Sequence, residues 1–318
     1  MPKRRELPRQ LSSPFSAREG RAAGLTPDQL RGDDIRTPYR GAHAAGLDFT
    51  RLDHRALAAQ AILPPSAVFS HTTAAALLGA PLGLAAQAHP VLHVTVPKPV
   101  RGPRVSGIVS HQRQRFDSVH RGRLRVIAPA EAWCDLGELL TEHDLIAVGD
   151  FLVTGNPYEK VLPLTTIQEL RVAISRRRGA PGVRACARAV AKVAEGSLSR
   201  PETLVRLLLT DAGVPAPRVN FSATDHRGSF IAMPDLAWPG VKVALEYEGD
   251  HHRGVRQFRD DIRRIERLAD NGWLVIKVSA DDVFDRPREL VDRVVRRLAS
   301  RGLSARGIRL PLDGVFVR

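Results

Sequence analysis

Residues 234–252 read PDLAWPGVKVALEYEGDHH, and this stretch decides the fold that we predict for the last third of the chain. Asp235 belongs to a predicted strand over residues 230–237, and Glu246 belongs to the next one, over residues 241–247. The proline–glycine turn between them is short, so the two strands are expected to be antiparallel neighbours. We therefore expect the two carboxylates to lie close together on adjacent strands.

Helices are predicted on both sides of this hairpin. The sequence Ser199-Arg200-Pro201-Glu202 is typical of a helix start, because serine caps the first turn and proline fits within it. Further elements are predicted as a strand near residues 218–223, a helix over 257–271, a buried strand over 273–278 and a last helix over 287–301. The order α-β-β-β-α-β-α predicts an α/β fold, more strictly a mixed α+β fold, with helices flanking a mixed sheet.

The two acids on this hairpin indicate metal chemistry. Mg²⁺ takes oxygen ligands and usually holds one or two protein carboxylates. An ion bound by Asp235 and Glu246 would polarise a phosphoryl oxygen and lower the pKa of a bound water. Glu248 lies two residues after Glu246 and shares its strand face, where two carboxylates need a cation or a proton to relieve their repulsion. The residues therefore predict a site for Mg²⁺ or Mn²⁺.

The same stretch resembles a known superfamily. Pro234-Asp235 and Glu246-Tyr247-Glu248-Gly249-Asp250-His251-His252 are followed in order by Asp261, Arg263, Gly272, Trp273, Val275 and Lys277. This arrangement resembles the PD-(D/E)XK nucleases, and among them the small domains related to the very-short-patch repair endonuclease. The resemblance covers residues 197–301. It implies an αβββαβ core and a Mg²⁺-dependent endodeoxyribonuclease that hydrolyses DNA phosphodiester bonds in repair or phage defence.

The resemblance also implies residue roles by position. Asp235 and Glu246 would hold the metal together with the backbone carbonyl of Tyr247. His252 would act as a general base or protonate the leaving oxygen, and His251 is the alternative for that task. A histidine in a loop is also often only solvated.

Glu202 has two competing interpretations. The resemblance implies that this helix acid orients a metal-bound water. The local sequence instead makes Glu202 the third helical residue of a capping box whose cap is Ser199. Both interpretations stay open.

The chain departs from the superfamily at Glu248, where relatives have a lysine. That lysine usually helps to stabilise the negative charge that develops on the phosphoryl group. Lys242, expected on the same strand face as Glu246, and Lys277 on the next strand are candidate substitutes. Arg263 is another source of positive charge, and Glu248 would become a further catalytic acid or metal ligand. Loss of cleavage is the alternative outcome.

The N-terminal part of the chain predicts a DNA-binding segment. Thr26 can cap a helix that has Pro27 at its first position and Gln29 closing a capping box. With the helix before it and residues 35–43 as a wing, residues 12–47 resemble a winged helix-turn-helix, although an ordinary helical hairpin fits nearly as well.

Residues 48–196 carry a looser resemblance. The order RGAH (residues 40–43), SHTTAAALLGAPL (70–82), LHVTVP (92–97) and VIAPAEAWCDL (126–136) is similar to the antitoxin-like domain of the AbiEi family. The resemblance implies an α+β domain and DNA binding by the preceding segment. Arg176, Arg177 and Arg178, with Arg263, are candidate nucleic-acid contacts, although solvated charges at a helix end are the commoner explanation for the first three.

Composition agrees with a DNA partner. The net charge of +14 favours binding to polyanions, although an arginine-rich, high-GC genome produces the same balance. The sequence predicts neither a membrane span nor a secretory signal, so we expect a cytoplasmic protein without a membrane partner. Cys134 and Cys186 fit no metal spacing and no disulfide framework.

The predicted organisation has five parts, and three functional classes compete. The parts are a disordered basic arm (1–11), a winged-helix-like segment (12–47), an AbiEi-like α+β domain (48–196), a nuclease-like domain (197–301) and a tail (302–318). The favoured class is the endonuclease. The alternatives are a non-catalytic DNA-binding regulator of antitoxin type with a degenerate nuclease fold, and a protein-interaction module.

Overall fold

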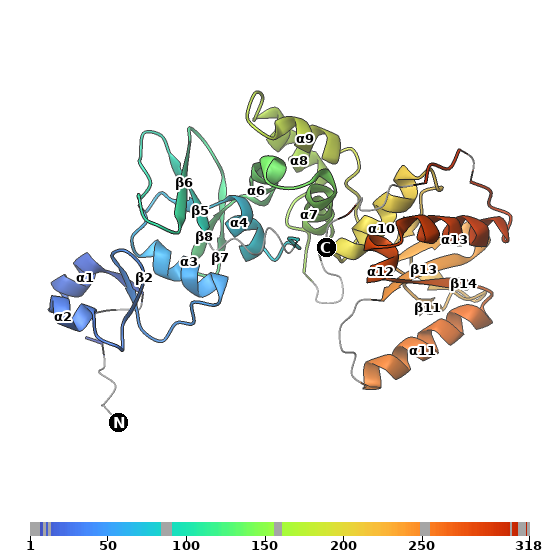
Figure 1. Cartoon of the computed structure of the whole chain (residues 1–318), viewed down its shortest axis with the longest axis horizontal. Helices are drawn as coiled ribbons and strands as arrows, with labels where there is room; N and C mark the ends of the chain where they lie inside the picture. The colour runs from blue at the N-terminus through green and yellow to red at the C-terminus, as the bar shows by residue number, and fades with distance from the viewer. Residues whose placement is uncertain are drawn as a thin grey trace. The chain divides into compact units, whose positions relative to one another are not determined.

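The computed structural model describes residues 7–8, 11, 14–83, 91–155, 161–248, 255–305, 307–310 and 316, with only the backbone for residues 255–262. The chain forms two compact units: Met1–Leu140 with Gln168–Ala187, and Thr141–Ile167 with Arg188–Arg318. Both units combine helices with sheets, so the chain has the mixed α/β class that the sequence predicts (Figure 1). None of the helices in these described ranges is long and apolar enough to cross a membrane.

The second unit is built on a four-stranded sheet in the order β14-β13-β12-β9. Its strands are β9 (Arg218–Val219), β12 (Leu236–Trp238), β13 (Val243–Glu248) and β14 (Leu274–Ser279). β13 pairs antiparallel with β12 and parallel with β14, so the sheet is mixed, as predicted.

Helices lie on both faces of this sheet (Figure 1). They are α10 (Arg200–Asp211), α12 (Ala280–Phe284) and α13 (Pro287–Ala299) on one face, and α11 (Val255–Asp270) on the other. Side chains alternate along β13, so Leu245 packs into the core beneath α10 and α13, whereas Ala244 packs with Leu268 of α11. Glu246 and Glu248 continue the series of Ala244, which directs them to the face that α11 covers.

The prediction of one continuous strand over residues 230–237 is wrong. β11 (Phe230–Ala232) pairs with β10 (Ala223–Thr224) in a separate two-stranded sheet, whereas β12 joins the main sheet. Pro234 lies between the two strands, and proline has no N–H to donate to a ladder. Asp235 therefore directly precedes β12 instead of lying inside a strand.

Helix α7 (Glu142–Thr154) comes from the middle of the chain and packs against α10. Its Asp150 is fully buried and accepts three hydrogen bonds, from Arg206 Nη2 at 2.7 Å, Thr203 Oγ1 at 2.8 Å and the Ala194 backbone at 2.8 Å. A buried carboxylate is tolerated only with such partners. The α7–α10 contact is therefore an integral part of the second unit.

The first unit begins with two short helices and a small sheet. The elements are β1 (Phe15–Ser16), α1 (Ala17–Ala22), α2 (Pro27–Leu30), β2 (Arg36–Tyr39) and β3 (Ala42–Ala44), and the strand order is β1-β3-β2. Thr26 Oγ1 accepts from the Gln29 backbone, and Gln29 Oε1 accepts from the Thr26 backbone. The predicted capping box is therefore confirmed.

The rest of the first unit is a five-stranded sheet with helices, in the order β6-β5-β4-β8-β7. The strands are β4 (Val68–Phe69), β5 (Leu92–Pro97), β6 (Ile108–Arg113), β7 (Ser118–Arg121) and β8 (Leu124–Ile127). The helices are α3 (Leu52–Gln60), α4 (His71–Leu77), α6 (Pro129–Asp135), η1 (Leu136–Glu138), α8 (Ile167–Ser175) and α9 (Val183–Ala189).

Candidate active site

Asp235 and Glu246 come together at the β12–β13 pair of the second unit. Leu236 pairs with Leu245, so Asp235 lies opposite Glu246, and opposite residues of an antiparallel pair share a face. The Asp235 carboxylate accepts a hydrogen bond from the Tyr247 backbone at 2.7 Å. Glu246 is only 4% exposed. Two acids that the sequence places 11 positions apart are thus neighbours in a shielded site.

The electrostatics of Asp235 reflect this grouping. Burial raises the pKa of Asp235, and the carboxylates of Glu202 and Glu246 raise it further, to about 8. The hydrogen bond from Tyr247 and the charge of Arg264 act in the opposite direction. Three acids therefore interact at this end of the sheet.

Glu202 has the local geometry of a helix cap and also approaches the acidic pair. Its backbone donates to Ser199 Oγ at 3.3 Å, so Ser199 is the N-cap of α10, as predicted. Its carboxylate accepts from Ser199 Oγ at 2.8 Å, the Leu198 backbone at 2.9 Å and Asn220 Nδ2 at 3.0 Å. Burial nevertheless raises the pKa of Glu202 above its usual value. The capping interpretation and the electrostatic one are compatible.

Two cations approach these acids on the face covered by α11. Arg264 Nη2 lies 2.8 Å from Glu246 Oε2, and Lys277 Nζ lies 2.7 Å from Glu248 Oε1. Lys277 is the neighbour of Glu246 on the parallel strand β14. Both cations thus come from outside β13, one from the adjacent strand and one from the helix.

The sequence predicts Lys242 on the strand face of Glu246, but Lys242 does not lie there in the structure. It is in the turn before β13, with a left-handed backbone at φ 50°, and its Nζ donates to the Asn271 carbonyl at 3.1 Å. The turn Pro239–Val241 extends one residue into the predicted strand over residues 241–247, and β13 begins only at Val243. Lys242 is therefore excluded as the substitute cation in this conformation.

The other residues that the sequence predicts for this site are Arg263, Tyr247, His251 and His252. The side chain of Arg263 is exposed on α11, and Tyr247 packs partly against the core on the other sheet face. His251 and His252 lie outside the described residues.

Two residues of this site were missed by the sequence reasoning. Arg264 lies four positions before the buried Leu268 and so shares the inner face of α11, a spacing that favours it over Arg263. Asn220 links Glu202 to the hairpin, because its backbone also donates to the Asp235 carbonyl at 2.9 Å. Its left-handed backbone, at φ 44°, is tolerated by asparagine but leaves no sequence signal.

The acids fit a hard cation by their chemistry. Asp235, Glu246 and Glu248 offer the carboxylate oxygens that Mg²⁺ and Mn²⁺ prefer. Among the residues that the structure describes, no three carboxylates have ligand oxygens all within 4.8 Å of one another. This arrangement suits an ion that takes one or two carboxylates and fills its other positions from elsewhere.

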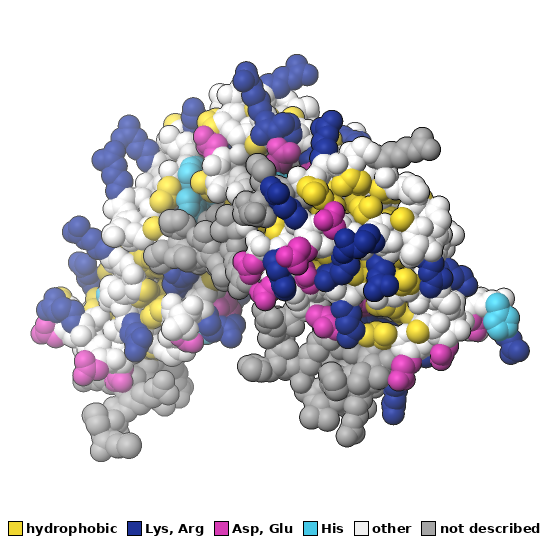
Figure 2. Space-filling model, turned by 45° about the vertical axis from the view of Figure 1, so that its right-hand side comes forward, with side chains coloured by type: hydrophobic (Ala, Val, Ile, Leu, Met, Phe, Trp, Pro, Cys, Tyr) yellow, Lys and Arg dark blue, Asp and Glu magenta, His cyan; other side chains and the backbone are white. Residues whose placement is uncertain are grey.

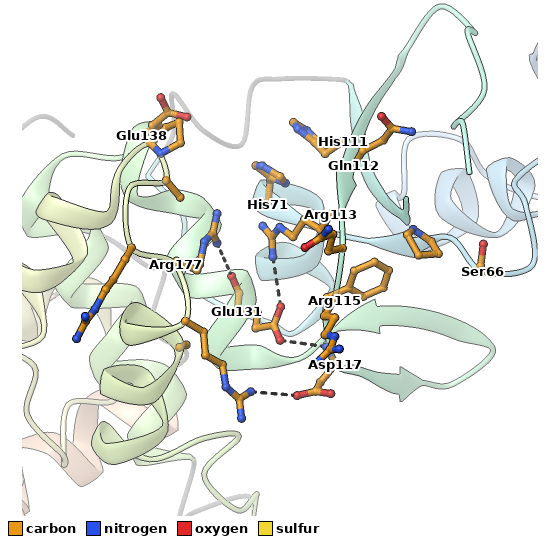
Figure 3. A pocket seen from close by; sticks show the side chains of 18 of the residues that line it. Ser66, His71, His111, Gln112, Arg113, Arg115, Asp117, Glu131, Glu138 and Arg177 are labelled. Carbon is orange, nitrogen blue, oxygen red and sulfur yellow. Dashed lines mark hydrogen bonds and ion pairs between the residues drawn. The ribbon is translucent and has the colours of Figure 1, made fainter. Parts of the chain in front are cut away.

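The arginine run Arg176-Arg177-Arg178 lies in the first unit, at a cavity of about 1310 Å³ (Figure 3). Arg177 Nη1 donates to the buried Asp135 Oδ1 at 2.5 Å, and Arg176 Nη1 lies 3.4 Å from Asp117 Oδ2. Arg177 is therefore part of a structural ion pair. The cavity is also lined by Arg113, Arg115 and Arg125, so it is strongly basic.

His71 and His111 line the same cavity (Figure 3). Burial lowers the pKa of His71 to about 2 and that of His111 to about 4, and neighbouring imidazoles and Arg113 act in the same direction. Both rings are therefore neutral at pH 7.

Comparisons with known proteins give two relatives. The chain is 33% identical over 132 residues to the uncharacterized protein MT2308 of Mycobacterium tuberculosis strain CDC 1551 / Oshkosh, and equally to the uncharacterized protein Rv2248 of strain ATCC 25618 / H37Rv. The match covers 41% of this chain and 48% of each relative, so the chain spans about half their length. No family model matches the chain. No solved structure matches it either.

Proposed function

We propose that the second unit is a metal-dependent DNA endonuclease of the PD-(D/E)XK type, acting in DNA repair or phage defence. The observation that supports this proposal most strongly is that Asp235 lies opposite Glu246 on adjacent strands. Glu202 is near enough for its charge to act on Asp235. A mixed sheet with helices on both faces is the scaffold that this class of nuclease requires.

The metal would be Mg²⁺ or Mn²⁺, held by Asp235, Glu246 and the Tyr247 carbonyl. Bound there, it would supply a Lewis acid for the phosphodiester and for the attacking water. The chain's own cations complete the site: Lys277 and Arg264 stand on the same face as the acids and are placed to offset negative charge on a phosphoryl group. Glu202, fixed by Ser199 and Asn220, adds a third carboxyl group at the edge of the site.

DNA binding would involve the first unit as well. The β1–α1–α2–β2–β3 arrangement is compatible with a winged helix, in which α2 is followed by a β-hairpin wing. Figure 2 shows Lys and Arg side chains at many points of the face in view, with acidic side chains between them. The net charge of +14 favours polyanion binding that weakens as salt rises. We propose this segment as the DNA-binding module that the AbiEi resemblance implies.

A nicking assay tests the enzyme. Full-length protein is incubated with supercoiled plasmid and Mg²⁺ or Mn²⁺. Asp235→Asn and Glu246→Gln are expected to lower the rate at least about 100-fold, because even outer-shell partners of a metal are worth about 10–100-fold. Glu289→Gln is the matched control, since Glu289 is exposed on α13, and its rate should equal that of wild type. Persistent cleavage in both site variants would falsify the assignment.

A second candidate function is a DNA-binding regulator that does not cleave. The specific observation in its favour is that Glu246 and Glu248 already have cationic partners, Arg264 and Lys277. Gel shifts separate the two functions: a regulator binds duplex DNA equally with Mg²⁺ or a chelator, binds equally well as Asp235→Asn, and produces no nicks.

A further inference from the structure

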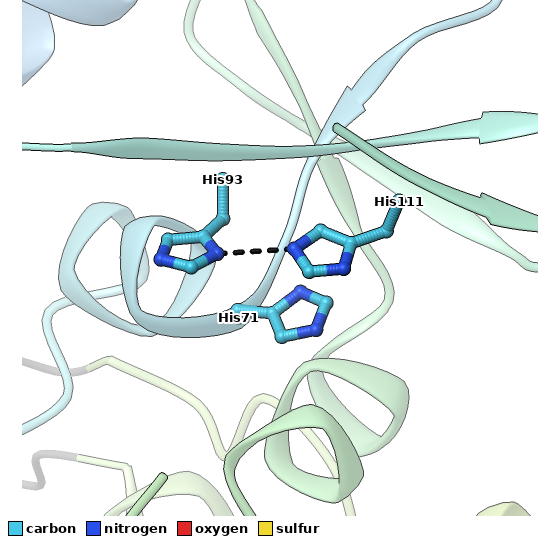
Figure 4. A group of neighbouring side chains, drawn as sticks. All are labelled: His71, His93 and His111. Carbon is cyan, nitrogen blue, oxygen red and sulfur yellow. Dashed lines mark hydrogen bonds between the residues drawn. The ribbon is translucent and has the colours of Figure 1, made fainter. Parts of the chain in front are cut away.

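Three histidines from separate elements of the first unit meet beside the five-stranded sheet (Figure 4). His71 is the first residue of α4, His93 lies on β5 and His111 lies on β6. In the parallel β5–β6 pair, Thr95 is the neighbour of His111, so His93 and His111 share one sheet face. One potential ligand nitrogen from each of the three rings lies within 4.8 Å of the other two.

The nitrogen spacing approaches that of a coordination site. His93 Nδ1 and His111 Nε2 are 3.1 Å apart, and two imidazole nitrogens on one tetrahedral Zn²⁺ would be about 3.3 Å apart at Zn–N distances of about 2.0–2.1 Å. The His71 ring lies against that of His111, with ring centroids 3.8 Å apart. The ring torsion of histidine is broad, so turning the rings toward a common point is a small change.

The surroundings of His71 are those of a supported ligand. Its Nδ1 lies 2.9 Å from Ser70 Oγ, which also accepts a hydrogen bond from Thr95 Oγ1. Asp135 Oδ2 lies 3.6 Å from the same nitrogen, and this oxygen is buried without a hydrogen-bond partner. A metal-bound histidine commonly donates its other ring N–H to a carboxylate, which fixes the ring and raises its basicity. The Nδ1 atom of His71 thus faces Ser70 and Asp135, and the Nε2 atom of the same ring remains to bind a metal ion.

The backbone of His71 adds a second observation. Its φ of 52° is in the left-handed region, which is uncommon for a residue with a side chain. Backbone strain of this kind persists where the surrounding structure fixes it and gathers at functional sites. The ring of His71 stacks on that of His111.

We propose that His71, His93 and His111 form a binding site for a divalent transition-metal ion of the Zn²⁺ class. Imidazole nitrogens suit Zn²⁺, Cu²⁺, Ni²⁺ and Co²⁺, whereas Mg²⁺ requires oxygen ligands, so this site differs in chemistry from the acidic site of the second unit. Three protein ligands leave a coordination position for a small molecule. The site opens on the arginine-lined cavity, because His71 and His111 line it.

Zinc titration of the full-length protein tests this site. Metal-stripped wild type, His93→Gln and His111→Gln are titrated with Zn²⁺ against a chromophoric chelator. Each substitution is expected to weaken the affinity of one Zn²⁺ equivalent at least about 100-fold, since removing a direct ligand should cost no less than removing an outer-shell partner. His120→Gln is the matched control, because His120 is exposed on β7 of the same sheet. Asp235→Asn should also retain this equivalent, which separates the site from the acidic one.

A measurement on the unmutated protein covers the case in which a variant fails to fold. X-ray absorption of wild type loaded with one Zn²⁺ equivalent is expected to show three imidazole nitrogens at about 2.0–2.1 Å. An oxygen-dominated shell, or equal zinc binding by wild type and both folded histidine variants, would overturn the proposal.

Discussion

At the residue scale, Lys277 offers a test of the proposed nuclease site. It lies beside Glu246 on the adjacent strand and pairs with Glu248, the position at which the nucleases that the sequence resembles have a lysine. If its ammonium stabilises charge on the phosphoryl group, Lys277→Met should lower the nicking rate about 100–1000-fold, the usual effect of losing one such group. The measurement is the rate of plasmid nicking under saturating Mg²⁺.

Lys242 supplies the control for that prediction. Both lysines are candidates from the sequence, but Lys242 Nζ contacts the Asn271 carbonyl in the turn. Lys242→Met should leave the nicking rate near that of wild type. Equal losses in both variants would mean that Lys277 acts only through general surface charge.

At the scale of single elements, Asp282 links a helix cap to a pH dependence. It is the third residue of the α12 capping box and also pairs with Arg293 at 3.0 Å. Burial by itself raises the pKa of Asp282, but the hydrogen bonds from Arg293 and Ser279 outweigh it and hold the pKa below its usual 3.8. The ionised form thus stabilises the folded state above pH 3.8, and this contribution is lost as the pH falls through the lower folded-state pKa.

Asp282→Asn tests this sign. Asparagine keeps an oxygen for the cap but loses the charge, so the variant should be less stable by about 1 kcal/mol or less at pH 7. The difference in unfolding free energy between the variant and wild type, measured by urea unfolding, should shrink as the pH approaches 3. A gap independent of pH would show that Asp282 acts through its shape and not its charge.

The sequence was most informative about single helices and strands. The capping box at Thr26 and the N-cap at Ser199 depend on residues three positions apart, so local chemistry determines them. The break at Pro234 was missed because it depends on which strand each side pairs with. Likewise, His71, His93 and His111 are each unremarkable in the sequence, and only the register of β5 and β6 brings them together.

At the scale of the whole molecule, the second unit depends on a helix from the middle of the chain. Asp150 of α7 neutralises the buried Arg206 of α10, and both side chains are at most 10% exposed. Asp150→Ala would leave a buried guanidinium without its carboxylate, which costs about 3–5 kcal/mol. Urea unfolding measures the loss, and Glu195→Ala, at an exposed position nearby, should cost little.

The double variant Asp150→Leu with Arg206→Met refines this prediction. Replacing both charges with apolar side chains removes the unpaired ion, so the double variant should be more stable than Asp150→Ala alone. An additive or larger loss would show that the α7–α10 contact depends on the charges themselves. The partners of Asp150 lie more than 40 positions away, which is why the sequence gives no hint of the pair.

The alternation of the two units along the chain also affects co-translational folding. Each unit is assembled from two segments that alternate in the sequence, so the first unit is incomplete until residue 187 has emerged. By then α7, which belongs to the other unit, has already left the exit tunnel. Translation of the 56 positions from Asp150 to Arg206 takes about 3–11 s at 5–20 residues per second. During that interval the Asp150 carboxylate lacks the guanidinium of Arg206, so the order of synthesis favours completion of the first unit before the second.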